Sequence, residues 1–163
     1  MSVVDRYDGD PETLAYLRQT TVSVGLHLRP QANRVFIADA AGGQDILRAM
    51  AYGARRIDAV DPHPLYAAFL RRQQNGFNHL LIDEERIRYR STTVRAFLQA
   101  SPEVFDLIQL PLGGDGGSGA SAFGENTLLT VEGLHQLWRH LDADGLLVMP
   151  LWTRLPPRSS SRR

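Results

Sequence analysis

Short apolar runs alternate with amphipathic segments along most of this chain. Runs typical of strands buried on both faces lie at 35–38, 57–60, 105–112 and 146–152, and a shorter, more polar one lies at 86–90. Between them, apolar residues recur at helical spacing, which predicts helices around 46–53, 65–75, 94–98 and 128–141. A first helix is expected over about 11–24, because Asp10, Pro11 and Glu12 form a typical helix start.

This alternation predicts an α/β fold. We expect a Rossmann-like, doubly wound, mostly parallel sheet with helices on both faces. The length of 163 residues fits one domain. We therefore expect a flexible N-terminus at 1–10, a single domain over 11–155 and a disordered tail at 156–163.

The composition excludes several kinds of chemistry. The chain has no Cys and all 18 of its basic residues are Arg, which excludes thiolate nucleophiles, disulfides, iron–sulfur clusters and lysine Schiff bases. The His residues lack the spacing of metal ligands, so no metal is expected. The formal net charge is zero, which predicts no nucleic-acid partner. No segment resembles a membrane span or a signal peptide, so we expect no membrane insertion and a cytoplasmic protein.

The loop after the first strand is the strongest chemical signal. In parallel sheets of this kind, ligands bind outside the carboxyl ends of the strands. This loop runs from Asp39 to Asp45, and its small residues Ala41, Gly42 and Gly43 would allow a ligand to approach the backbone and the helix start. A tight turn between a strand and a helix needs the same small residues, so the loop alone leaves both interpretations open.

A carboxylate at the end of the second strand favours a nucleoside ligand. Asp61 lies about 20 residues beyond the glycine pair, where an acid can accept both hydroxyls of a ribose. It can also cap the following helix, and both roles can hold together. Asp39 and Asp45 would repel a pyrophosphate and suit a cationic ligand. They therefore favour S-adenosylmethionine or its decarboxylated form over NAD, which is the least favoured alternative.

The same residues resemble a known family. Residues 39–45 are similar to the D-x-G-x-G-x-G motif of class I S-adenosylmethionine-dependent methyltransferases. The wider chain resembles the spermidine synthase-like, or aminopropyltransferase-like, branch, which includes large membrane proteins with a fused cytosolic synthase-like domain. The matching segments are 10–17, 42–47, 52–56, 59–64, 105–110, 125–134 and 151–158.

The resemblance implies a transferase that moves a methyl or aminopropyl group from a sulfonium donor to an unknown small-molecule acceptor, such as an amine in polyamine synthesis. It places Thr92 where the family has an acid that meets adenine. With the loop acids on the sulfonium side and Asp61 on the ribose, the expected cofactor-binding residues are Asp39, Ala41, Gly42, Gly43, Asp45, Asp61, Pro62, His63, Thr92 and Gln109.

The chain also departs from the family. The family has a proton-accepting Asp after its fourth strand, whereas this chain has Gln109 and no base in the next three residues. Asp115, Glu125 or a His would have to replace it, and otherwise the domain is a catalytically silent nucleoside-binding or regulatory module. We also expect the family's substrate-side β-domain to be missing. The sheet has five expected strands where class I methyltransferases usually have seven, which predicts a homodimer or fusion to a larger protein.

Overall fold

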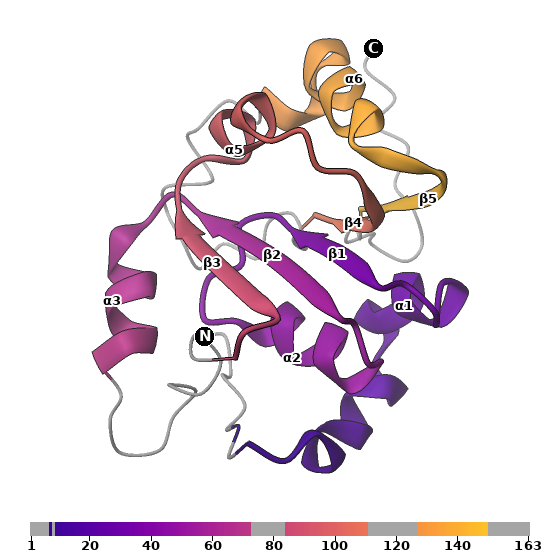
Figure 1. Cartoon of the computed structure of the whole chain (residues 1–163), viewed down its shortest axis with the longest axis vertical. Helices are drawn as coiled ribbons and strands as arrows, with labels where there is room; N and C mark the ends of the chain where they lie inside the picture. The colour runs from indigo at the N-terminus through magenta and orange to yellow at the C-terminus, as the bar shows by residue number, and fades with distance from the viewer. Residues whose placement is uncertain (1–6, 8, 73–83, 111–126, 150–163) are drawn as a thin grey trace, which may run out of the picture.

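A five-stranded parallel sheet forms the centre of the molecule. The computed structural model describes residues 7, 9–72, 84–110 and 127–149. Its strands are β1 (Arg34–Ile37), β2 (Arg56–Asp61), β3 (Ile87–Ser91), β4 (Phe105–Gln109) and β5 (Leu141–Val148). They lie in the order β3-β2-β1-β4-β5, so the direction of winding changes between β1 and β4 (Figure 1).

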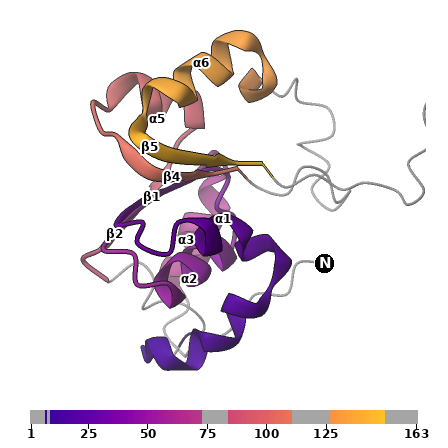
Figure 2. The same ribbon diagram turned by 90° about the vertical axis from the view of Figure 1, so that its right-hand side faces the viewer.

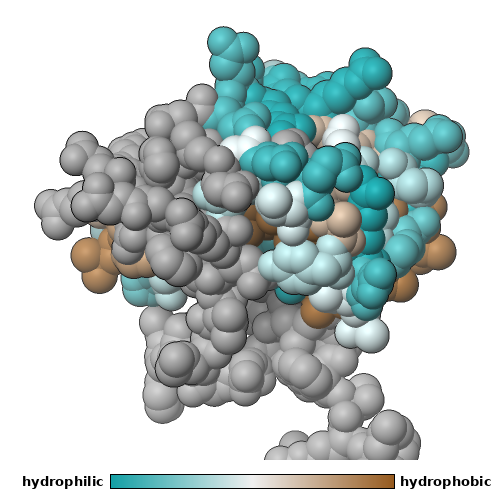
Figure 3. Space-filling model, turned by 90° about the horizontal axis from the view of Figure 1, so that it is seen from below, coloured by the Kyte–Doolittle hydropathy of each residue, from teal (hydrophilic) through white to brown (hydrophobic). Residues whose placement is uncertain are grey.

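Helices cover both faces of this sheet, as the sequence predicted (Figure 2). On one side lie α1 (Val24–Leu28), α2 (Gln44–Ala51) and α3 (Pro64–Arg72), together with the 3-10 helices η1 (Pro11–Gln19) and η2 (Thr21–Ser23). On the other lie α5 (Val94–Ala100) and α6 (Val131–Arg139), preceded by η3 (Thr127–Leu129). The Rossmann-like, doubly wound α/β fold is therefore confirmed. Seen from the side of η1, the described surface is mainly hydrophilic (Figure 3).

Two sequence predictions of local structure were wrong. The expected helix over 11–24 is broken at Thr20, which has an extended backbone. The Thr20 and Ser23 hydroxyls donate to the Leu17 carbonyl at 2.9 and 2.8 Å, and such bonds compete with the helical pattern. The last helix ends at Arg139, so that Leu141 begins β5. A bulge between Phe105 and Leu107 lets β5 pair with β4 at Leu141 and again from Leu146 to Val148.

The core lies on both sides of the sheet. Phe36 of β1 is fully buried on the side of α5, where its ring stacks on Phe97 with centroids 5.0 Å apart and lies 5.2 Å from Phe105. The opposite face packs the apolar residues of α2 against β1 and β2. Because β1, β2 and β4 are buried on both faces, their positions are fixed, and so are the loops at their ends.

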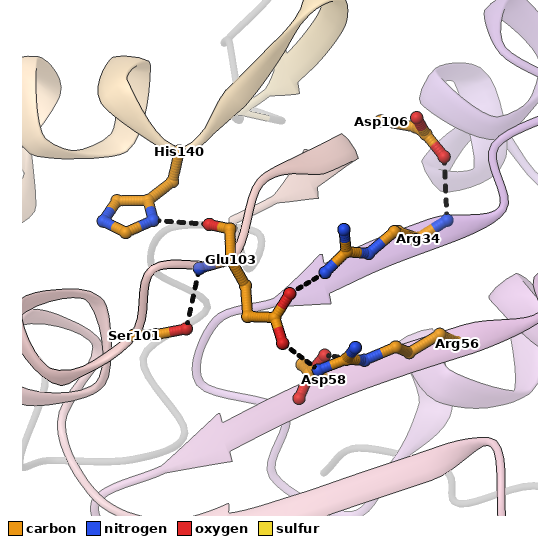
Figure 4. A network of polar contacts seen from close by, with 7 residues as sticks. All are labelled: Arg34, Arg56, Asp58, Ser101, Glu103, Asp106 and His140. Carbon is orange, nitrogen blue, oxygen red and sulfur yellow. Dashed lines mark hydrogen bonds and ion pairs between the residues drawn. The ribbon is translucent and has the colours of Figure 1, made fainter.

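The amino-terminal edge of the sheet is held by an ion-pair network centred on Glu103 (Figure 4). Its carboxylate binds the guanidinium of Arg34 and accepts from Arg56 Nη2 at 2.7 Å, and Arg56 also pairs with the buried Asp58. The ring Nδ1 of His140 lies 2.7 Å from the Glu103 carbonyl oxygen. The network ties the loop before β4 to the starts of β1 and β2.

This network predicts a pH-dependent contribution of Glu103 to stability. Hydrogen bonds from Arg56, and then Arg34, lower the pKa of Glu103 from its ordinary value of 4.5. A carboxyl group with a lowered pKa stabilises the fold above its ordinary pKa and loses that contribution as the pH falls through the folded value. We expect Glu103→Gln to lower the free energy of unfolding at pH 7 in urea titrations, and the difference to shrink as the pH falls below 4.5 and to vanish below the pKa of the folded state. A difference that persists in acid would contradict this prediction.

Candidate functional site

The carboxyl ends of β1 to β4 meet at one edge of the sheet. Ile37 pairs with Ala59 and Gln109, and Asp61 pairs with Ser91, so the loops that follow these strands are neighbours. All ten residues predicted to bind the cofactor lie in these loops or in the adjoining strand and helix ends. Asp115 and Glu125, the two candidate bases, lie outside the described residues.

The loop after β1 has an unusual backbone. Asp39 and Ala41 have φ angles of 45° and 43°, in the left-handed region that non-glycine residues rarely occupy. Gly43, with φ 88°, is the N-cap of α2. Left-handed non-glycine residues cost free energy and cluster at functional sites. Ala41 is the more strained of the two, because an Asp side chain tolerates this conformation better.

Two hydrogen bonds from neighbouring strands hold Ala41 in this conformation. Its amide donates to Asp61 Oδ2 at 2.9 Å, and its carbonyl accepts from Tyr89 Oη at 2.9 Å. Tyr89 is buried on β3, and its pKa is raised by burial and by the nearby Asp61 carboxylate. The sequence analysis missed Tyr89. The alternation of Ile87 and Tyr89 with arginines is a signal that could have placed Tyr89 on a buried face, but no local pattern indicates its polar partner.

Asp61 lies at the centre of this edge and is only 3% exposed. Its second oxygen, Oδ1, accepts from the His63 amide at 2.7 Å, just before α3 begins at Pro64. A carboxylate oxygen can accept two hydrogen bonds, so each oxygen of Asp61 can accept one more in addition to its bond from a backbone amide. Pro62 and His63 are exposed beside it. The position predicted for ribose binding therefore also fixes the first loop.

Thr92 joins the same part of the site through the backbone. Its amide donates to the Asp61 carbonyl at 3.0 Å, and its side chain is half-buried. The next residue, Thr93, is the N-cap of α5 and accepts from the Ala96 amide. The Thr92 backbone therefore lies beside Asp61.

Asp39 is an exposed residue near Asp61. Partial burial of its carboxyl group, followed by the Asp61 carboxylate, raises the pKa of Asp39, while His63 opposes the shift. An acid with a raised pKa stabilises the fold below its ordinary pKa, and this contribution is lost as the pH rises through the folded value. Ionised Asp39 therefore destabilises the free protein at neutral pH.

We expect Asp39→Asn to stabilise the ligand-free protein at pH 7, by less than about 1 kcal/mol because the group is exposed. Asn tolerates the left-handed backbone found at this position. Thermal unfolding of both proteins at pH 7 and pH 3 measures the effect. The gain should shrink in acid, where wild-type Asp39 is also neutral, and a loss of stability at pH 7 would contradict the prediction.

Asp45 lies at the other side of the loop, in the first turn of α2. Its Oδ1 accepts from Gln109 Nε2 at 2.9 Å and is 2.5 Å from Arg48 Nη1. Burial raises the pKa of Asp45, and the Arg48 guanidinium opposes that shift. Gln109 is 1% exposed at the end of β4, where its amide orients Asp45.

Other site types find little support in the described structure. Over the residues that the structure describes, no group of three acidic, His or Cys side chains could hold a metal. Within the same ranges, no helix is long and apolar enough to cross a membrane. A groove of about 480 Å³ lies between α5 and α6, lined by Arg95, Gln99, Glu132, His135, Gln136 and Arg139. None of the predicted site residues lines it.

Comparison with known proteins identifies the fold class. No family model and no curated protein matches the chain. Among solved structures, it is similar to a SAM-dependent methyltransferase from Agrobacterium tumefaciens, with 17% identity and a TM-score of 0.57, covering 85% of this chain and 46% of that one. A methyltransferase from Thiobacillus denitrificans, solved with S-adenosyl-L-homocysteine, shows 19% identity, a TM-score of 0.53 and coverage of 91% and 51%. A spermidine synthase in complex with the transition-state analogue AdoDATO shows 17% identity and a TM-score of 0.55, covering 82% of this chain and 42% of that one.

The chain therefore has the Rossmann-like fold of class I methyltransferases. It spans about half the length of these three proteins. Methyltransferases and a spermidine synthase share this fold, so the likeness by itself assigns no activity to the chain.

Proposed function

We propose that this domain binds an adenosine-containing sulfonium donor, S-adenosylmethionine or its decarboxylated form, at the carboxyl edge of the sheet. The observation that supports it is the pairing of the buried Asp61 carboxylate with the strained loop at Ala41. A carboxylate with one free acceptor site on each oxygen suits the two adjacent hydroxyls of a ribose. Thr92 lies on the side of β3, where the adenine would extend.

The acidic residues favour a cationic ligand over a dinucleotide. Asp39 and Asp45 lie at either end of the first loop, and Asp45 occupies the start of α2, where a pyrophosphate would otherwise bind. Asp45 is paired with Arg48, whereas Asp39 and Asp61 have no ion-pair partner among the residues that the structure describes. A sulfonium donor brings positive charge to these acids.

We propose a group transfer to a small-molecule acceptor, such as an amine, as the activity of this site. A bound sulfonium supplies an activated methyl or aminopropyl group with a good leaving group. The residues of this chain contribute mainly binding and orientation, which can lower the barrier by holding the acceptor in line with the transferred carbon. A proton acceptor for an amine would come from Asp115 or Glu125.

A silent nucleoside-binding module is the second candidate. Gln109 occupies the end of β4, and its amide is already bonded to Asp45. An amide cannot take a proton at neutral pH, so the described part of the site holds no base after β4. This observation favours a binding or regulatory role without transfer.

A panel of four ligands tests the proposal. We expect S-adenosylmethionine or its decarboxylated form to raise the thermal midpoint, since a ligand at 100 times its dissociation constant adds about 2.7 kcal/mol of stability. NAD should produce no shift, and methylthioadenosine should produce a smaller one. Release of S-adenosylhomocysteine or methylthioadenosine in the presence of an amine mixture would separate an enzyme from a binder. Failure of all four to bind would refute the proposal.

A further inference from the structure

Two donors converge on one oxygen atom where the winding of the sheet changes direction. Oδ1 of Asp45 accepts a hydrogen bond from Gln109 Nε2, at the end of β4. It accepts a second from Arg48 Nη1, which lies one turn further along α2. Because both donors reach the same atom, the Arg48 guanidinium is held close to the carboxyl end of β4. In sheets of this kind, ligands bind beside that change of direction, between the β1 and β4 ends.

Arg48 has hydrogen-bond donors that Asp45 does not use. Its side chain is 14% exposed and that of Asp45 is 17% exposed, so neither side chain is closed off from solvent. A guanidinium has five N–H donors, whereas Asp45 takes one of them. The Nε of Arg48 is buried and has no hydrogen-bond partner among the described residues. A planar carboxylate is the group that matches such a fork of donors.

We infer that Asp45 and Arg48 together bind the amino-acid head of the donor, so that the donor keeps its carboxylate. This inference rests on the proposed function. An ion pair is complementary to a zwitterion: the ligand's ammonium faces Asp45, and its carboxylate faces Arg48. Decarboxylated S-adenosylmethionine has the ammonium but offers Arg48 no acceptor. The site therefore selects S-adenosylmethionine, and Arg48 determines that specificity.

Calorimetric titration of the two sulfonium donors tests this assignment. The whole chain should bind S-adenosylmethionine at least 10-fold more tightly than the decarboxylated form. Arg48→Gln should weaken S-adenosylmethionine by roughly 10- to 100-fold, the loss expected for hydrogen bonds between charged groups, and leave the decarboxylated form within about threefold. The preference should thus disappear in the variant. Arg48→Lys, which keeps the charge but loses the fork, should give an intermediate preference.

Arg55→Gln is the matched control, because it removes the same charge from an exposed residue just beyond α2. It should retain the preference of the wild type, and circular dichroism should show that all variants are folded. Equal affinity of the wild-type protein for the two donors, or an equal loss for both in Arg48→Gln, would overturn the inference and leave the proposed function standing. Failure of the wild type to bind either donor, methylthioadenosine or S-adenosylhomocysteine would instead overturn the proposed function, and this inference with it.

Discussion

Replacing Asp61 with alanine should lower the affinity for S-adenosylmethionine by at least about 100-fold. The variant loses two hydrogen bonds from ribose hydroxyls to a carboxylate, each contributing about 1.5–3 kcal/mol. It also loses the bond that holds the strained Ala41, so the first loop relaxes away from the conformation that meets the ligand. Isothermal titration of wild-type and variant protein measures the loss.

Asp106→Ala provides a control at the opposite edge of the sheet. Like Asp61, Asp106 accepts two backbone amides, those of Asn33 and Arg34, each at 2.8 Å. Both variants should destabilise the fold by a similar amount, but only Asp61→Ala should lose the ligand. Equal losses of affinity would show that instability alone explains the result. Unchanged binding by a folded Asp61→Ala protein would remove the central residue of the proposed site.

Replacing Phe36 with alanine should lower the free energy of unfolding by about 3–5 kcal/mol. Phe36 is fully buried in β1 and contacts the rings of both Phe97 and Phe105. The substitution leaves a cavity between the sheet and α5, where close packing prevents complete collapse. This is a large share of the 5–15 kcal/mol that stabilises a typical domain. Urea unfolding followed by circular dichroism measures it.

The same substitution at an exposed site separates burial from side-chain identity. Phe69 of α3 is 43% exposed, so Phe69→Ala should cost much less than Phe36→Ala. Comparable losses at the two positions would contradict the role assigned to the core around β1. A loss of affinity in Phe36→Ala with little change in stability would mean that β1 acts on the site directly.

β1 and β2 were predictable because burial on both faces leaves a continuous apolar run, whereas β3 has buried residues that alternate with exposed ones. All three strands begin and end within one residue of the expected limits. The errors lie at the periphery of the sheet, in the segment after Pro11 and at the start of β5. There the outcome depends on hydroxyl groups that compete for backbone carbonyls and on a bulge, neither of which has a hydrophobic period.

The order of elements along the chain determined the fold class and which loops share an edge, since right-handed crossovers leave few ways to arrange this alternation. It therefore indicated Asp61 and the first loop together. Only the tertiary structure decided how these groups are used. The bonds of Ala41 with Asp61 and Tyr89, and of Asp45 with Gln109, join residues 20, 48 and 64 positions apart in the chain. Such contacts depend on strand register and on loop conformation, which local sequence patterns do not encode.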